Sequence, residues 1–111
     1  MSAFLYLLLV MAAIHFAVDV QFQSDFVAIH KNRRITEGRR LPWIYAMLSH
    51  TACHGLAVGW FLANPLLGAV EMAAHFVIDC AKCEGYTNIH VDQVLRIVCK
   101  AAWAAITVTT A

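Results

Sequence analysis

Ionisable side chains recur at four-residue spacing inside long apolar stretches of this chain, and this spacing constrains its fold more than any other feature. Residues four apart lie on the same face of a helix. The surrounding segments are apolar enough to be solvated by lipid, where ionisable groups are costly and usually functional. We therefore expect helices whose polar faces meet at one site. The eight side chains concerned are His15 with Asp19, His50 with His54, Glu71 with His75 and Asp79, and the nearby His90.

The composition is that of a membrane protein. Hydrophobic residues make up 61% of the 111 residues and charged residues only 14%, with a mean hydropathy of +0.66, whereas a soluble domain has roughly 25% charged and 45–50% apolar residues. The net charge of +1 argues against a nucleic-acid partner, because nucleic-acid-binding domains concentrate a basic excess on one face. The apolar N-terminus follows no basic segment and has no small-residue cleavage site, so we interpret it as a retained first span.

Four segments approach the roughly 20 residues that a helix needs to cross the hydrocarbon core. We expect the first to leave the bilayer near Gln21 and to continue as an interfacial turn of helix. Pro42 suits a helix start, and Asn64-Pro65 separates two helices. Because the later connections are short, we predict an all-α integral membrane four-helix bundle of two antiparallel hairpins. It forms a single domain over 1–111, with helices at about 3–28, 42–63, 66–83 and 89–110.

The loop 31–40 sets the expected orientation. It holds five of the eight basic residues of the chain, and basic loops face the cytoplasm. We interpret it as a solvated loop rather than a dedicated site for anionic lipid. The prediction is a multi-pass protein of the bacterial inner membrane, in contact with the lipid bilayer and with both termini on the far side. The large aromatic residues, among them Trp103, fit interfacial belts.

Charge counting suggests a bound cation. Within the expected spans lie four acids, and only Arg96 and Lys100 are fixed bases. The excess negative charge requires protonation, histidinium or a cation. Imidazole and carboxylate are ordinary ligands for zinc, manganese or nickel, while a proton or hydrogen-bond network without metal, or simple packing of histidines, remains an alternative. The expected ligands of a divalent metal ion are His15, Asp19, His75 and Asp79, with His50 or His54 completing the shell or acting as a base.

Several motifs of the chain resemble those of a family without assigned function. The family consists of small polytopic membrane proteins from bacteria and bacteriophages, with the patterns H-F-x-x-D-F-x-x-Q-[ST]-D, H-x-x-[IL]-D-x-x-K and D-Q-x-x-H. The chain departs from them at Val20, where an aromatic residue is expected, and at Arg96, where a histidine is expected and which we expect to pair with Asp92 or Asp79. The matching segments are His15-Phe16-Ala17-Val18-Asp19 with Gln23-Ser24-Asp25, His75-Phe76-Val77-Ile78-Asp79 with Lys82, and Asp92-Gln93.

The resemblance implies a membrane protein often encoded by phages, and it leaves two interpretations of function open. Its H-x-x-x-D pairs look like those of membrane-bound metal-dependent hydrolases, which implies hydrolysis of a lipid-linked or phosphate-bearing substrate. In that interpretation Glu71 is a candidate general base and His54 a second catalytic residue. The alternative is a non-enzymatic phage protein that acts by oligomerisation or by binding a host membrane protein, as in superinfection exclusion, anti-defence or pore formation. There the polar residues would hold the helices together or line a pore.

Overall fold

The protein is all-helical, as the sequence predicts. The computed structural model describes all 111 residues and contains no strand. The last three helices begin and end within two residues of the expected spans. The first expected span is divided, because its helix ends at Gln21 and a new helix begins at Asp25, where the Ser24 hydroxyl accepts a hydrogen bond from the Val27 amide at 3.2 Å. The elements are α1 (Ala3–Phe16), a π-helical segment η1 (Ala17–Gln21), α2 (Asp25–His30), α3 (Trp43–Phe61), α4 (Pro65–Cys83) and α5 (Ile89–Thr110).

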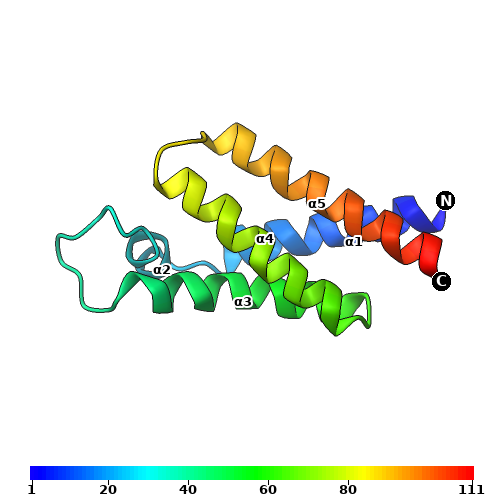
Figure 1. The fold of residues 1–111 in the computed structure, drawn as a ribbon, viewed down its shortest axis with the longest axis horizontal. Helices are drawn as coiled ribbons and strands as arrows, with labels where there is room; N and C mark the ends of the chain where they lie inside the picture. The colour runs from blue at the N-terminus through cyan, green and yellow to red at the C-terminus, as the bar shows by residue number, and fades with distance from the viewer.

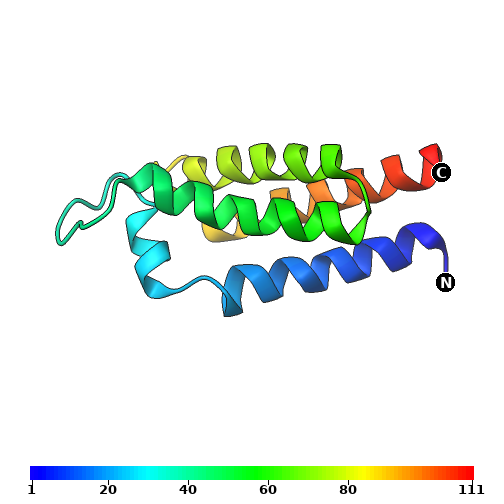
Figure 2. The same cartoon turned by 90° about the horizontal axis from the view of Figure 1, so that it is seen from below.

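The four long helical segments lie along one axis of a body measuring 48 × 24 × 21 Å. Both termini lie at one end, and the loop that follows α2 lies at the other (Figures 1 and 2). Antiparallel α3 and α4 form the most extensive helix pair, while α5 packs against α4 and α1. Asn64 and Asn88 cap α4 and α5 by accepting hydrogen bonds from the backbone amides of Leu67 and Val91.

Glycines allow α3 and α4 to approach closely. A Cβ atom at Gly55 would lie 2.7 Å from the carbonyl oxygen of Gly68, and a Cβ at Gly68 would lie 2.7 Å from the carbonyl oxygen of Gly55. No side chain fits there without a shift of backbone. This contact fixes how near α3 comes to α4, and therefore how near the polar side chains of the two helices come to each other.

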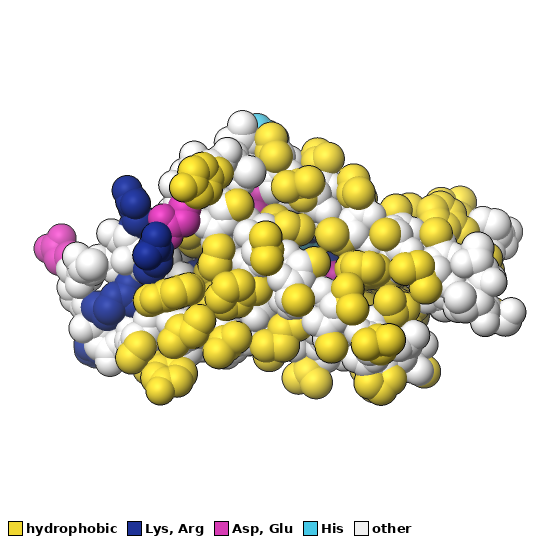
Figure 3. Space-filling view, viewed as in Figure 1, with side chains coloured by type: hydrophobic (Ala, Val, Ile, Leu, Met, Phe, Trp, Pro, Cys, Tyr) yellow, Lys and Arg dark blue, Asp and Glu magenta, His cyan; other side chains and the backbone are white.

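The interior of the bundle is polar and its surface is apolar. Of the 20 buried residues, 12 are polar or charged and only six are hydrophobic, and the two largest fully buried side chains are Arg96 and Lys100. Charged side chains are almost never fully buried unless they are paired, and those buried here form ion pairs with one another. Apolar side chains cover the middle of the face seen in Figure 3, and Lys and Arg side chains gather at the end with the loop. The exposed apolar residues include Leu56, Trp60, Leu66, Val77, Val94 and Val98.

One helical segment, Ala3–Gln21, is both long and apolar enough to cross a membrane, with a mean hydropathy of 2.2. A single apolar segment near an N-terminus is weak evidence, because a signal sequence has the same character. The other long helices carry the buried histidines and charged residues, which lower their mean hydropathy. The four spans predicted from the sequence are therefore not established by helix length and composition, although the helices themselves are present.

Candidate metal centre

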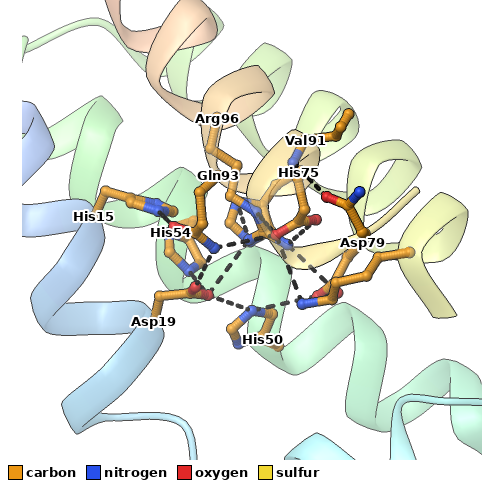
Figure 4. Close-up of polar contacts among 12 residues, drawn as sticks. His15, Asp19, His50, His54, His75, Asp79, Val91, Gln93 and Arg96 are labelled. Atoms are coloured by element: carbon orange, nitrogen blue, oxygen red, sulfur yellow. Dashed lines mark hydrogen bonds and ion pairs between the residues drawn. The ribbon is translucent and has the colours of Figure 1, made fainter.

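The polar faces of four helical segments meet in the middle of the bundle (Figure 4). Asp19 comes from η1, His50 and His54 from α3, and His75 from α4. Asp19 lies inside the π-helical segment rather than one regular turn after His15. A π-helical turn is rare and is found frequently at functional sites. Here the wider turn carries a carboxylate toward three imidazoles.

Four of these side chains form a group suited to a metal ion. Ligand atoms of Asp19, His50, His54 and His75 all lie within 4.8 Å of one another, and the three histidines are buried. The Asp19 Oδ1 atom is 3.3 Å from His50 Nε2 and 3.5 Å from His54 Nε2. Ligands about 2.0–2.1 Å from a tetrahedral zinc ion are separated by about 3.3 Å. The distances from Asp19 to the two histidines therefore fit an ion that Asp19 shares with each of them.

Three buried histidine nitrogens lack a hydrogen-bond partner: Nδ1 of His15, and two nitrogens that belong to the donor group. His50 Nε2 and His54 Nε2 are buried, and their contacts with Asp19 Oδ1 at 3.3 and 3.5 Å are ion-pair contacts rather than hydrogen bonds. Buried polar atoms are normally satisfied. A cation between the imidazoles and the Asp19 carboxylate would satisfy both nitrogens at once, so the donor set fits a divalent metal.

His15, expected among the ligands, lies beside the group rather than in it. Its ring centre is 5.4 Å from that of His54 and 6.1 Å from that of His75. Its Nε2 atom lies 3.0 Å from the side-chain oxygen of Gln93, whose amide nitrogen donates to Asp19 Oδ2 at 3.3 Å. Gln93 therefore connects His15 with Asp19, a role that its place in the sequence does not indicate.

Asp79, also expected as a ligand, pairs with a lysine instead. Its Oδ2 atom accepts a hydrogen bond from Lys31 Nζ at 2.7 Å and lies 3.4 Å from His50 Nε2. Both members of the Lys31–Asp79 pair are buried. Asp79 is thus next to the donor group and engaged by an ammonium, while the exposed His90 lies outside the site.

Glu71, expected as a general base, lies next to His75 on the side of its Nδ1 atom. Its Oε1 atom is 3.5 Å from His75 Nδ1. The same carboxylate accepts a hydrogen bond from Lys100 at Oε1 and one from the indole nitrogen of Trp103 at Oε2, the latter at 2.6 Å. Carboxylates in this position orient the histidine ligands of metals by binding the other ring nitrogen. His54, expected as a second catalytic residue, belongs to the donor group itself.

Arg96 reaches the centre of the cluster from α5. Its guanidinium donates two hydrogen bonds to Asp92, at 2.9 and 3.0 Å, and lies 3.4 Å from Asp79 Oδ1. It also lies 3.3 Å from Asp19 Oδ1 and contacts His75 Nε2. Arg96 was expected to pair with Asp92 or Asp79, and it pairs with both. It also contacts Asp19 and His75, two members of the donor group.

The predicted excess of negative charge is not found. The four buried or half-buried acids are matched by four cations, because Lys31 and Lys82 lie in the cluster in addition to Arg96 and Lys100. Lys82 Nζ is 3.7 Å from Asp79 and 3.6 Å from Asp92. Lys31 was expected in a solvated loop. The chain instead turns back after α2 and buries this lysine against Asp79. The two residues are 48 positions apart, so no local sequence pattern indicates the contact.

Arg39 links backbone groups near both ends of the loop 31–40. The Arg39 guanidinium donates to the carbonyl oxygens of His30, Asn32 and Leu41 at 2.9, 2.7 and 3.1 Å, and also to that of Ile35. These hydrogen bonds join the two ends of the loop, and residues 33–38 between them are exposed. The loop can therefore keep Lys31 in place.

Comparison with known proteins gives no match to a family model, a curated protein or a solved structure. The resemblance to phage and bacterial membrane proteins stays a prediction, and the functional assignment depends on the side chains of this chain alone.

Proposed function

We propose that this protein is a multi-pass membrane protein that binds one divalent metal ion through Asp19, His50, His54 and His75. The observation that carries the proposal is the donor group, with its two buried histidine nitrogens that lack hydrogen bonds. Three imidazoles and one carboxylate suit zinc, nickel or manganese. Zinc is the first ion to test, because four-coordinate sites of nitrogen and oxygen ligands are typical of it.

The inverted polarity of the fold supports insertion in a membrane. Helices of 19 and 22 residues are about 28 and 33 Å long at about 1.5 Å per residue, close to the roughly 30 Å thickness of the hydrocarbon core. Apart from Lys82 near the end of α4, the charges that lower the hydropathy of α4 and α5 are those of buried side chains, so lipid would meet mainly apolar surface. In this proposal the loop 31–40 faces the cytoplasm of a bacterial cell.

Ion binding is a better account of the geometry than hydrolysis. Catalytic zinc sites keep one coordination position open, whereas four protein ligands fill a tetrahedral shell. Glu71 is held by Lys100 and Trp103, so it is already engaged. Hydrolysis of a lipid-linked or phosphate-bearing substrate would require one donor, such as His54, to act as a base instead. The ion is therefore proposed to join η1, α3 and α4.

A second candidate is a polar network without metal. The observation that favours it is the balance of four acids by four cations within the cluster. In that case the protein is a non-enzymatic membrane protein whose ion pairs hold the helices together, and its partner is another copy or a host membrane protein.

Metal analysis of the full chain in detergent separates the two candidates. Protein freed of metal by chelator is incubated with zinc, manganese or nickel, passed through a desalting column, and assayed for bound metal and thermal stability. We expect one ion per chain and a higher melting temperature with the ion, because a ligand that binds only the folded state stabilises it. His54→Ala should lose both effects. His90→Ala, which removes an exposed histidine outside the cluster, should keep both.

A wild-type protein that retains no ion, and whose melting temperature is the same with and without chelator, would favour the network. Equal metal binding by wild type and His54→Ala would show that the ion binds elsewhere.

A further inference from the structure

We propose that Arg96 is a built-in competitor of the metal ion, whose guanidinium occupies the metal-binding position until an ion displaces it. This inference rests on the proposed metal site and concerns its regulation. It predicts that removal of the Arg96 side chain tightens metal binding, although Arg96 forms ion pairs with three acids of the cluster, Asp19, Asp79 and Asp92.

The contacts of Arg96 with the donor group are direct. Its Nη1 atom contacts His75 Nε2 and lies 3.3 Å from Asp19 Oδ1. These are ligand atoms of the kind that a metal ion would use, and they belong to two of the four donor residues. An ion bound between them would lie next to a positive charge in a buried site, where like charges repel strongly. A guanidinium cannot be deprotonated in a protein, so the repulsion is relieved only by movement.

The remaining contacts of Arg96 provide a position to which it can withdraw. The side chain is anchored to Asp92 by two hydrogen bonds, at 2.9 and 3.0 Å, and faces Asp79 at 3.4 Å. Neither acid belongs to the donor group. Arg96 can therefore release His75 and Asp19 while it keeps a carboxylate partner, which makes displacement by an ion feasible.

Lys100 is a matched control for this effect. It is the next buried cation on α5, one helical turn after Arg96, and its side chain is 1% exposed, like that of Arg96. Its partner is Glu71, and it has no hydrogen bond or ion pair with any of the four donors. Removal of Lys100 thus subtracts the same charge from the interior without freeing a donor atom.

Zinc affinity of the full chain in detergent tests the proposal, measured by competition with a chromophoric chelator for wild type, Arg96→Met and Lys100→Met. We expect Arg96→Met to lower the Kd for zinc at least tenfold and Lys100→Met to change it less than threefold. An equal decrease of the Kd for zinc in both variants would indicate a general effect of charge instead of direct competition, and would overturn the proposal. Unchanged or weaker binding by Arg96→Met, with zinc binding by wild type intact, would overturn this proposal alone.

Absence of zinc binding from both wild type and Arg96→Met would overturn the metal site and this inference together. Zinc binding by Arg96→Met alone would support competition in its strongest form. An NMR measurement on the wild type does not depend on how the variants fold. The side-chain Nε–Hε resonance of Arg96 should shift when zinc is added. An unchanged Arg96 resonance at saturating zinc would contradict displacement.

Discussion

Single residues inside this bundle are held by partners that the chain brings from far away. Lys31 and Asp79 show this most clearly, since both side chains are buried and their hydrogen bond at 2.7 Å joins the loop to α4. Removal of one member of a buried ion pair is strongly destabilising, because it leaves a charge without its partner, whereas replacement of both members is often neutral. The stability of the loop end should therefore depend on Lys31 more than on any other residue of the 31–40 loop.

Lys31→Met should lower the free energy of unfolding by about 3 kcal/mol, at the low end of the range for broken buried pairs. The loss is limited because Arg96 and Lys82 remain near Asp79, at 3.4 and 3.7 Å. Thermal or denaturant unfolding in detergent measures the change. Arg34→Met is the control, since this exposed side chain lies 3.5 Å from Glu84 and surface pairs contribute about 0–1 kcal/mol. Equal losses in the two variants would show that burial of Lys31 does not matter.

Glu84 offers a prediction about pH at the loop end. Hydrogen bonds from Arg33, one of them at 3.2 Å, lower the pKa of the Glu84 carboxyl below its usual value. Because the pKa is lower in the folded state, this interaction stabilises the fold fully above the unfolded pKa. The contribution is lost as the pH falls through the folded pKa. Carboxyl NMR titration should show a lowered pKa for Glu84, and Arg33→Gln should raise it. The same pKa in both proteins would contradict the assignment.

At the scale of helices, the distance between α3 and α4 decides whether the donors meet. His50 and His54 lie on α3 and His75 on α4, and the closest approach of these helices is at Gly55 and Gly68. An added methyl group at Gly68 would meet backbone atoms rather than a flexible side chain. The helices would have to separate, and the distance between the histidines would grow with them.

Gly68→Ala should therefore destabilise the hairpin by about 1–2 kcal/mol. Overpacking costs about 1–3 kcal/mol, and the replacement of glycine by alanine within a helix returns about 0.5–1 kcal/mol. Zinc affinity should fall in the same variant. Gly59→Ala is the milder comparison, because its Cβ would lie 3.3 Å from the nearest backbone atom instead of 2.7 Å. If Gly68→Ala had the same or higher stability than wild type, the close contact would not limit the helix pair.

At the scale of the whole molecule, charge and polarity are distributed along and across the long axis. The exposed basic residues lie at the end with the loop, and both termini lie at the opposite end of the 48 Å body (Figures 1 and 3). The apolar middle between the two ends is the part proposed to lie in lipid. This distribution predicts that the two ends are accessible from different sides of the membrane.

Cysteine labelling of intact cells tests this orientation. In a background where the four native cysteines, all free thiols, are replaced by alanine, Thr36→Cys should react only after the cytoplasmic side is made accessible. Ala111→Cys should react with an impermeant reagent from outside. Labelling of both positions from the same side would contradict the spanning arrangement. The reverse pattern would invert the orientation and place the loop outside.

The helices and their polar faces can be predicted from the sequence, because both depend on neighbours along the chain. The proline and asparagine residues near 42, 64 and 88 mark the ends of helices, and the four-residue spacing of His50 with His54 places both on one face of α3. The same local reasoning placed Asp19 and His75 in the candidate site. It did not identify the π-helical turn that holds Asp19.

Which polar residues meet depends on how the helices pack, and the sequence pattern does not specify it. The selection of Asp19, His50, His54 and His75 over His15 and Asp79 depends on the rotation and separation of whole helices, and on partners such as Gln93 and Lys31 that compete for the same side chains. Periodicity along the chain specifies a face but not what that face contacts. The burial of Lys31 and the place of Arg96 among the donors arise from packing between segments distant in sequence, which local spacing does not encode.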